Sequence, residues 1–219
     1  MMIYTITTSF RIALTVSSVV ALIALYTYKS DDADRSRHLF LIQDLAGGTY
    51  TTLLVGTSTI RRIPFNALAE CRPFRLRGLN SALLIDVSLY MSAIKPDDQV
   101  HTILLYAGEN DLSNGKKFYD IQEKFTELLN MLEKKFSRAK IIIIGLKFST
   151  ARKAAWPEFR QFNAFAKQWA SANSRGNYID TAWSEEENAS AFFEEDGVHL
   201  NDRGYRKLLP TITEACKAI

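Results

Sequence analysis

Short apolar runs alternate with stretches of helical periodicity from Thr49 onward, and this alternation constrains the fold more than any other feature of the chain. The run Ile141–Ile144 consists of four isoleucines, which is typical of a strand buried on both faces. The predicted strands are Thr52–Val55, Phe74–Arg77, Val100–Tyr106, Lys140–Gly145 and Asn177–Asp180.

Helical patterns separate these runs. Between Lys117 and Phe136 the apolar positions form one stripe opposite a charged face: Ile121, Phe125, Leu128, Leu129 and Leu132. Pro157 begins a second helix that runs to about Asn173, and Asn201 or Asp202 caps a last one that reaches Ala218. Strands that alternate with helices predict an α/β fold, a three-layer α/β/α sandwich with a mostly parallel sheet. Ligands bind such sheets outside the carboxyl ends of the strands.

Length and charge set further bounds. A chain of 219 residues with 47% hydrophobic residues can build one substantial core, so we expect a single folded domain. The net charge is +3 and the basic residues are scattered among acids, which argues against a nucleic-acid partner. Cys71 and Cys216 lack metal-type spacing. We favour buried or free thiols for them, with one disulfide as the alternative in an oxidising compartment.

The N-terminus carries an apolar segment. Ile12 to Tyr28 is an uncharged stretch bracketed by Arg11 and Lys29, at the lower limit for a membrane-spanning helix. A cleaved signal peptide is the rival, but the residues after the apolar run form a poor cleavage site, so we favour an uncleaved anchor. The expected organisation is an anchor over 1–28, a polar tether over 29–48 that ends in a short packed element around Leu39–Leu45, and a soluble domain over 49–219.

Four short clusters carry the candidate chemistry: Gly56-Thr57-Ser58, Gly78, Gly108-Glu109-Asn110-Asp111 and Asp196-Gly197-Val198-His199. The first follows an apolar strand, which would bring Ser58 to the edge of the sheet. The last places a carboxylate three residues before a histidine, where it can accept Nδ1–H and leave Nε2 free to take a serine proton. Each cluster alone is also an ordinary turn, and their joint occurrence in this order favours catalysis.

These residues resemble the SGNH hydrolases, also called the GDSL esterase/lipase family, over roughly Thr52 to Leu208. The resemblance implies that Ser58 is the nucleophile, His199 the base and Asp196 its charge partner. It also implies an oxyanion hole formed by the Ser58 N–H, the Gly78 N–H and the Asn110 amide. Gly56, Thr57, Gly108 and Asp111 would support the site.

The chain departs from the family pattern at two places. Thr57 replaces the aspartate of the usual Gly-Asp-Ser, and Asn80-Ser81 stands where many members carry another glycine. The chemistry needs no metal or other cofactor, and no His/Cys/Asp spacing indicates a metal site.

The leading function is a serine esterase that removes a small acyl group, acetyl in particular, from a carbohydrate or similar ester. The alternatives are an SGNH-type O-acetyltransferase acting on an envelope polysaccharide, a lysophospholipase or thioesterase, and a catalytically inactive scaffold. Two features near His199 bear on the substrate. A run of acidic residues would disfavour anionic substrates if it bordered the pocket, and four aromatic residues could stack on a sugar or serve as packing anchors: Trp156, Trp183, Phe192 and Phe193.

The compartment has conflicting signals. Lys29, Arg35 and Arg37 follow the apolar segment while Arg11 precedes it, and the positive-inside count points the domain to the cytoplasm. The resemblance and the aspartates at 31, 32 and 34 point outside. We expect a membrane-anchored domain on the extracytoplasmic side, periplasmic or at the cell surface. The sequence predicts no oligomeric state.

Overall fold

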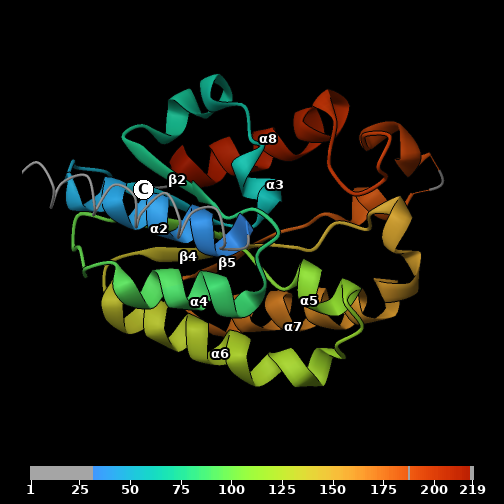
Figure 1. The fold of residues 1–219 in the computed structure, drawn as a ribbon, viewed down its shortest axis with the longest axis horizontal. Helices are drawn as coiled ribbons and strands as arrows, with labels where there is room; N and C mark the ends of the chain where they lie inside the picture. Colours follow the sequence, from blue (N-terminus) through green and yellow to red (C-terminus); the bar gives the residue numbers. More distant parts are fainter. Residues whose placement is uncertain (1–31, 187, 218–219) are drawn as a thin grey trace, which may run out of the picture.

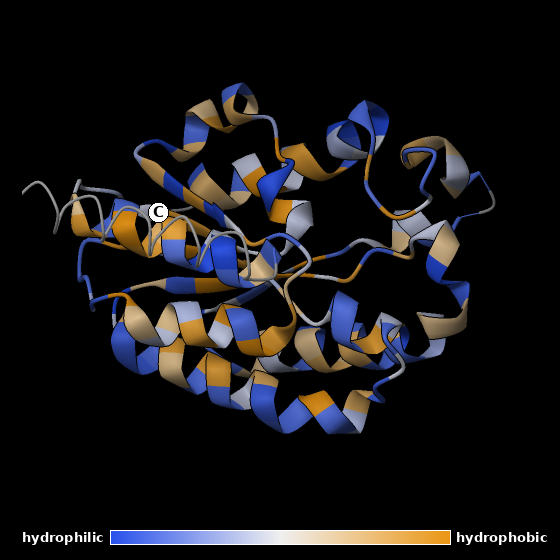
Figure 2. Ribbon diagram, viewed as in Figure 1, coloured by the Kyte–Doolittle hydropathy of each residue, from blue (hydrophilic) through white to orange (hydrophobic). Residues whose placement is uncertain are grey.

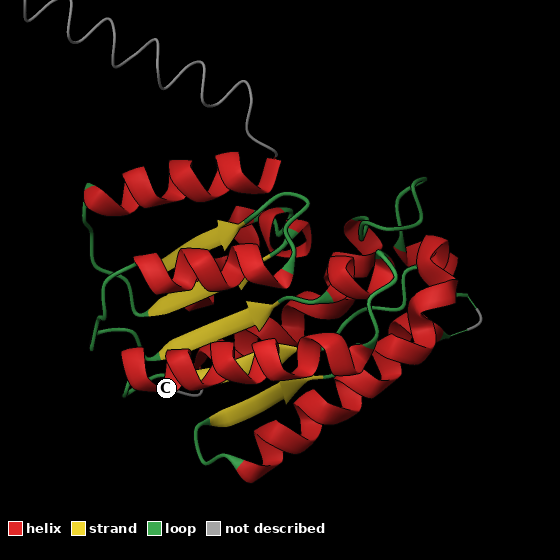
Figure 3. Cartoon of the chain, turned by 60° about the horizontal axis from the view of Figure 1, so that its bottom comes forward, coloured by secondary structure: helices red, strands yellow, loops and turns green. Residues whose placement is uncertain are grey.

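A five-stranded parallel sheet forms the centre of the molecule. The structure is a computed structural model that describes residues 32–186 and 188–217. The sheet order is β2-β1-β3-β4-β5, and every neighbouring pair is parallel (Figure 3). The strands are β1 (Thr52–Gly56), β2 (Phe74–Gly78), β3 (Thr102–Tyr106), β4 (Lys140–Ile144) and β5 (Gly176–Ile179).

The strands form where the sequence predicts them, because their side chains are covered on both faces of the sheet. All five residues of β1 and of β3 are buried, and the isoleucines of β4 are at most 1% exposed. Figure 2 shows this hydrophobic interior against the alternating colours of the surrounding helices. The three-layer α/β/α expectation is therefore confirmed, and so are all five predicted strands.

Helices cover both faces (Figure 1). One layer contains α4 (Leu84–Ala93), α6 (Phe118–Lys135) and α7 (Trp156–Ala172); the other contains α3 (Ser58–Arg61), the 3₁₀ segment η1 (Phe65–Cys71) and α8 (Asp202–Lys217). The predicted apolar stripe of α6 is buried at all five positions. Shorter elements lie around the carboxyl edge of the sheet: α5 (Glu109–Ser113), η2 (Thr150–Ala155), η3 (Ala182–Glu185) and η4 (Ala189–Phe192).

The tether expected over residues 29–48 differs from the structure in its described part. Helix α2 (Asp32–Leu45) occupies this region and packs against α4. Polar contacts attach it: the Arg37 guanidinium donates to Asp86, and the Tyr90 hydroxyl donates to Asp44 at 2.6 Å. The apolar side chains of α2 at 39, 42 and 45 are exposed. Hydrophobic periodicity therefore gave no sign that this segment is a docked helix.

The two cysteines form a disulfide, which corrects the preference for free thiols. Cys71 at the end of η1 is bonded to Cys216 in α8, and both residues are buried. The bond joins segments 145 residues apart in the sequence.

The proposed anchor, residues 12–28, lies outside the described residues. Within 32–186 and 188–217, no helix is long and apolar enough to cross a membrane.

Candidate active site

Three chain segments meet at the carboxyl edge of the sheet. Ser58 begins α3 directly after β1, Asn110 lies in α5 directly after β3, and His199 lies just before α8. Adjacent parallel strands end at the same edge, so β1 and β3 bring the first two side chains together. A hydrogen bond from the Tyr205 hydroxyl of α8 to the Thr59 carbonyl, 2.8 Å long, ties the last helix to α3.

Ser58, His199 and Asp196 form one chain of hydrogen bonds. His199 Nε2 lies 3.1 Å from Ser58 Oγ, and His199 Nδ1 lies 2.6 Å from Asp196 Oδ2. The nucleophile candidate and the base candidate come from residues 141 positions apart. The structure thus brings together the three residues selected from the sequence, in the order that proton transfer from serine to histidine requires.

A tight turn fixes the Asp196 carboxylate. Its Oδ1 accepts the backbone N–H groups of Val198 and His199 at 2.8 and 2.9 Å. Burial opposes the charge, but these bonds and the His199 ring outweigh it and hold the pKa of Asp196 well below its usual range. Gly197 makes the turn possible, because its φ is +63° and a Cβ would lie 2.8 Å from Thr150 Oγ1.

Asn110 is held with its amide at the site. Its Nδ2 donates to the Ala82 carbonyl at 2.8 Å, which leaves a second amide hydrogen for another acceptor. Asp111, beside it, is buried and accepts both the Leu84 N–H at 2.7 Å and the Lys116 ammonium at 2.9 Å. Asp111 therefore braces the segment that carries Asn110.

Gly78 is placed differently from the expectation. It ends β2, pairs with Gly56 and does not line the cavity beside Ser58. A Cβ at Gly78 would lie 2.1 Å from the backbone nitrogen of Arg61, so the glycine allows α3 to pack against β2. Ser81, three residues later, lines the cavity instead.

Ser81 has the backbone that the missing glycine would have. Its φ is +51°, in the left-handed region that favours glycine, and its N–H makes no hydrogen bond to any residue that the structure describes. The sequence signal was present in Asn80-Ser81, where many members of the resembling family carry glycine.

The remaining support residues lie in the strand ends and turns. Thr57 precedes α3, is buried, and donates its N–H to the Tyr106 carbonyl at 3.1 Å, which ties the nucleophile turn to β3. Gly56 is the last residue of β1, and Gly108 precedes α5.

A cavity of about 390 Å³ opens over these residues. All of its lining residues are polar or charged: Asp32, Ser58, Arg62, Asn80, Ser81, Asn110, Asn114, Arg152 and His199. None of the glutamates described in the acidic run before His199 borders it, and Glu194 lines a separate hollow. The four aromatic residues do not line it either. Trp156 packs edge-on against Phe148, and Trp183 packs edge-on against Phe192.

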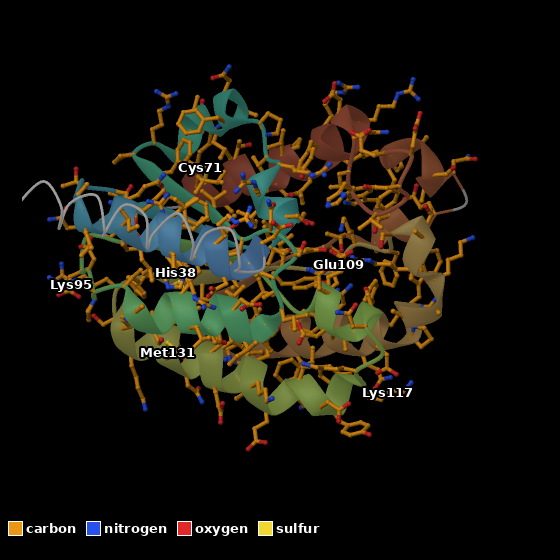
Figure 4. The ribbon with its side chains drawn as sticks, in the orientation of Figure 1. His38, Cys71, Lys95, Glu109, Lys117 and Met131 are labelled. Atoms are coloured by element: carbon orange, nitrogen blue, oxygen red, sulfur yellow. A yellow bond between two sulfur atoms is a disulfide. The ribbon has the colours of Figure 1, made fainter. Side chains whose placement is uncertain are left out.

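A buried ionic cluster surrounds Glu109, which is labelled in Figure 4, and it includes Arg152 from the cavity lining. Lys147 Nζ contacts both carboxylate oxygens at 2.6 and 2.7 Å, and the Tyr106 hydroxyl donates to Oε2 at 2.6 Å. Arg152 Nη1 lies 3.1 Å from Oε1. Burial opposes the charge on Glu109, but Lys147 and Arg152 outweigh it and keep its pKa below the usual range.

Sequence reasoning missed this cluster. Its sequence signals were a lysine and a glutamate, each three residues after the end of a buried strand.

Comparison with known protein families identifies the class of protein to which the chain belongs. The sequence profile of the GDSL-like Lipase/Acylhydrolase family matches residues 48–207. The chain belongs to this family. Its members are acylhydrolases, and the protein is accordingly an enzyme of the ester-hydrolase class.

Solved structures share the acylhydrolase fold at low sequence identity. A GDSL-like lipase from Bacteroides thetaiotaomicron is 16% identical with a TM-score of 0.70, covering 84% of this chain and 98% of that one. The lipase/acylhydrolase from Enterococcus faecalis is 16% identical with a TM-score of 0.63, covering 78% and 96%. A carbohydrate esterase family 3 protein from Talaromyces cellulolyticus is 13% identical with a TM-score of 0.61, covering 78% and 100%. No curated protein matches the chain.

The groups around this cavity are ones that acyl transfer needs. A serine hydroxyl lies within hydrogen-bond distance of an imidazole, and a carboxylate orients that imidazole. Ser81 and Asn110, which carry backbone and amide N–H donors, line the same cavity. In the described residues no group of His, Cys, Asp and Glu side chains has the arrangement of a metal site.

Proposed function

We propose that this acylhydrolase is a serine esterase that removes a small acyl group, acetyl in particular, from a carbohydrate or similar ester. His199 takes the proton of Ser58, Ser58 attacks the ester carbonyl, and Asp196 stabilises the imidazolium that forms. The Ser58 N–H, the Ser81 N–H and the Asn110 amide receive the oxyanion, with Ser81 in the role first given to Gly78. Water then releases the acyl group from Ser58.

The hydrogen-bond chain from Ser58 through His199 to Asp196 carries this proposal. The cavity supports the substrate class, because none of its lining residues is apolar. A long acyl chain gains affinity by burying methylene groups against apolar walls, at about 0.8 kcal/mol for each group. A polar cavity of about 390 Å³ instead fits a small acyl group on a hydroxyl-rich alcohol.

The first test uses the full chain, purified in detergent. It is treated with a fluorophosphonate probe and, separately, with p-nitrophenyl acetate, beside Ser58→Ala and Ser58→Thr. Labelling and acetate release by the wild type alone support the esterase. A wild type that folds but neither labels nor hydrolyses any ester contradicts the esterase and favours the scaffold alternative.

Two further assays separate the remaining alternatives. A p-nitrophenyl ester series from acetate to decanoate should show falling kcat/KM as the acyl chain lengthens, and a maximum at long chains would favour a lysophospholipase or thioesterase. Acetyl transfer to an added oligosaccharide, at a rate above hydrolysis, would favour the O-acetyltransferase.

The location is part of the proposal: residues 12–28 anchor the domain on the extracytoplasmic side. The Cys71–Cys216 disulfide supports this side, because such bonds persist in oxidising compartments. Asp32 lines the catalytic cavity, and the chain from Tyr28 to Asp32 spans at most about 14 Å. An anchor that ends at Tyr28 would therefore hold the cavity close to the membrane surface.

Location is tested in intact cells of the native host. A membrane-impermeant protease should digest the domain without cell lysis, and a maleimide-polyethylene glycol reagent should shift the denatured protein only after reduction. Protection from the protease, together with free thiols in the unreduced protein, would contradict this location.

A further inference from the structure

Two arginines give the catalytic cavity a positive side. Arg62 lies in the first turn after Ser58, and its backbone N–H donates to the Ser58 carbonyl at 3.0 Å. Arg152 reaches the cavity from η2. Asp32 is the one carboxylate among the lining residues that the structure describes.

Lys147 already neutralises the Glu109 carboxylate. The positive charge of Arg152 is therefore not cancelled by Glu109. The Lys147 ammonium contacts both carboxylate oxygens at 2.6 and 2.7 Å. Arg152 Nη1 is farther away, at 3.1 Å from one oxygen, and that atom is buried without a hydrogen bond to any described residue. Two cations thus share one anion, and the second cation borders the cavity.

The position of Arg152 suits recognition of a ligand. Glu109 and the turn of η2 hold the guanidinium near the site, and 22% of its side chain is exposed. A guanidinium fixed in this way loses little side-chain freedom when it binds an anion, and it offers paired N–H donors that match a carboxylate or a phosphate.

We propose that Arg152, assisted by Arg62, binds an anionic group on the alcohol part of the ester. The substrate class is then an acylated acidic compound, such as a sugar that carries a carboxylate or phosphate beside the esterified hydroxyl. This assignment rests on the proposed esterase function and narrows its substrate. The acidic run would disfavour anionic substrates only if it bordered the pocket, and the glutamates described in that run do not border the cavity.

The test compares two acetyl esters that differ mainly in charge. The substrates are 4-acetoxybenzoate and 4-acetoxybenzamide, with 4-acetoxyphenyl phosphate as the phosphate probe. Arg152→Gln should lower the ratio of kcat/KM for the anionic ester to that for the neutral ester by about tenfold or more. Arg62→Gln should lower it about two- to fivefold, since that side chain is exposed. Asp32→Asn should raise the ratio.

Two control variants define the background. Arg160→Gln removes an arginine near η2 that pairs with Glu185 and does not line the cavity, so its ratio should equal that of the wild type. Arg152→Lys keeps the charge and should recover part of the preference. A ratio that stays within twofold of the wild type in both Arg152→Gln and Arg62→Gln would overturn the proposal.

A binding experiment separates this inference from the esterase proposal. Calorimetry measures 4-acetoxybenzoate binding to Ser58→Ala and to the Ser58→Ala/Arg152→Gln double variant, neither of which needs to hydrolyse the ester. Tighter binding of the benzoate than of the benzamide, lost with Arg152, supports the anion site even if the wild type has no esterase activity. Equal binding of both compounds overturns it even in an active esterase.

Discussion

Two carboxylates of this protein each bind a cationic or protonatable partner, yet their surroundings differ. Asp196 is 46% exposed and contacts an imidazole whose other nitrogen reaches Ser58. Glu109 is 3% exposed and is surrounded by Lys147, Arg152 and Tyr106. Lys147 and Tyr106 are buried with Glu109, and Arg152 is 22% exposed. In the Asp196 arrangement, one nitrogen faces the cavity and can exchange a proton there.

The difference shows that a carboxylate paired with a basic side chain can either assist proton transfer or hold secondary-structure elements in place. Breaking a buried ion pair leaves an uncompensated charge in a medium of low dielectric constant, so the Glu109 cluster holds α5 and η2 in fixed positions. The Asp196 pair lies near water, where its contribution to stability is small, and in the proposed mechanism it assists proton transfer. The first should therefore matter for folding, and the second for rate.

The largest expected effect is on rate. His199→Ala should lower kcat/KM for p-nitrophenyl acetate by roughly 10⁴–10⁶, because the general base is lost. The thermal midpoint should change little, since the ring lies at the edge of the cavity. Stopped-flow or long-time hydrolysis assays, with differential scanning fluorimetry on the same sample, measure both quantities. A variant within tenfold of the wild type would remove His199 from the mechanism.

The next effect is on stability. Lys147→Met should lower the free energy of unfolding by about 3–5 kcal/mol, because Glu109 loses its closest cation. Adding Glu109→Gln to this variant should recover much of the loss, since the carboxylate that Lys147 neutralised is then absent. Urea unfolding of the two single variants and the double variant gives the coupling energy. Additive losses would show that the two side chains do not act as a pair.

Asn110 lies between the buried Glu109 cluster and the cavity, because it follows Glu109 directly in the sequence but lines the cavity. A variant at this position therefore shows whether the residue serves stability or rate. Asn110→Ala should lower kcat by about 10²–10³ through loss of one oxyanion donor. Asn110→Asp, which keeps the size but lacks the amide donors, is the matched variant and should be equally slow. A change in KM alone would assign Asn110 to substrate binding.

The smallest expected effect is on the stability of the protein at acidic pH. The folded-state pKa of Asp196 lies below its unfolded value, so the stabilisation is present above the unfolded pKa of about 4 and is lost as the pH falls toward the folded pKa. Between pH 5 and pH 2.5, the wild type should lose more unfolding free energy than Asp196→Asn. The difference should stay under about 1 kcal/mol because the group is nearly half exposed. Urea unfolding at several pH values measures this difference, and equal acid sensitivity of the two proteins would contradict the lowered pKa of Asp196.

The elements predicted correctly from the sequence are those whose burial leaves a pattern in neighbouring residues. Strands buried on both faces appear as apolar runs, and α6 appears as a stripe of period 3.6. Ser58, Asn110 and the Asp196–His199 turn were found because each lies in a short motif whose order resembles a family. Their arrangement in space agrees with the roles proposed for them.

Other features escaped the sequence because they depend on distant contacts. Glu109 and Lys147 are 38 residues apart, and nothing local pairs them. Helix α2 docks through polar groups as well as a few apolar side chains, such as Ala33 and Phe40, and several of its other apolar positions face solvent, so no clear stripe marks the buried side. The resemblance assigned Gly78 to the oxyanion hole. In the structure, Ser81 has the left-handed backbone conformation and lines the cavity.

The Cys71–Cys216 bond also has a consequence for biosynthesis. Its first cysteine precedes four of the five strands, and its second follows all of them. A growing chain must therefore hold Cys71 as a thiol while the sheet and both helical layers are made, and the bond can close only when the last helix arrives. Disulfide formation is thus a late step that follows folding of the sheet and the helices. An oxidant that modifies Cys71 earlier should lower the yield of native protein.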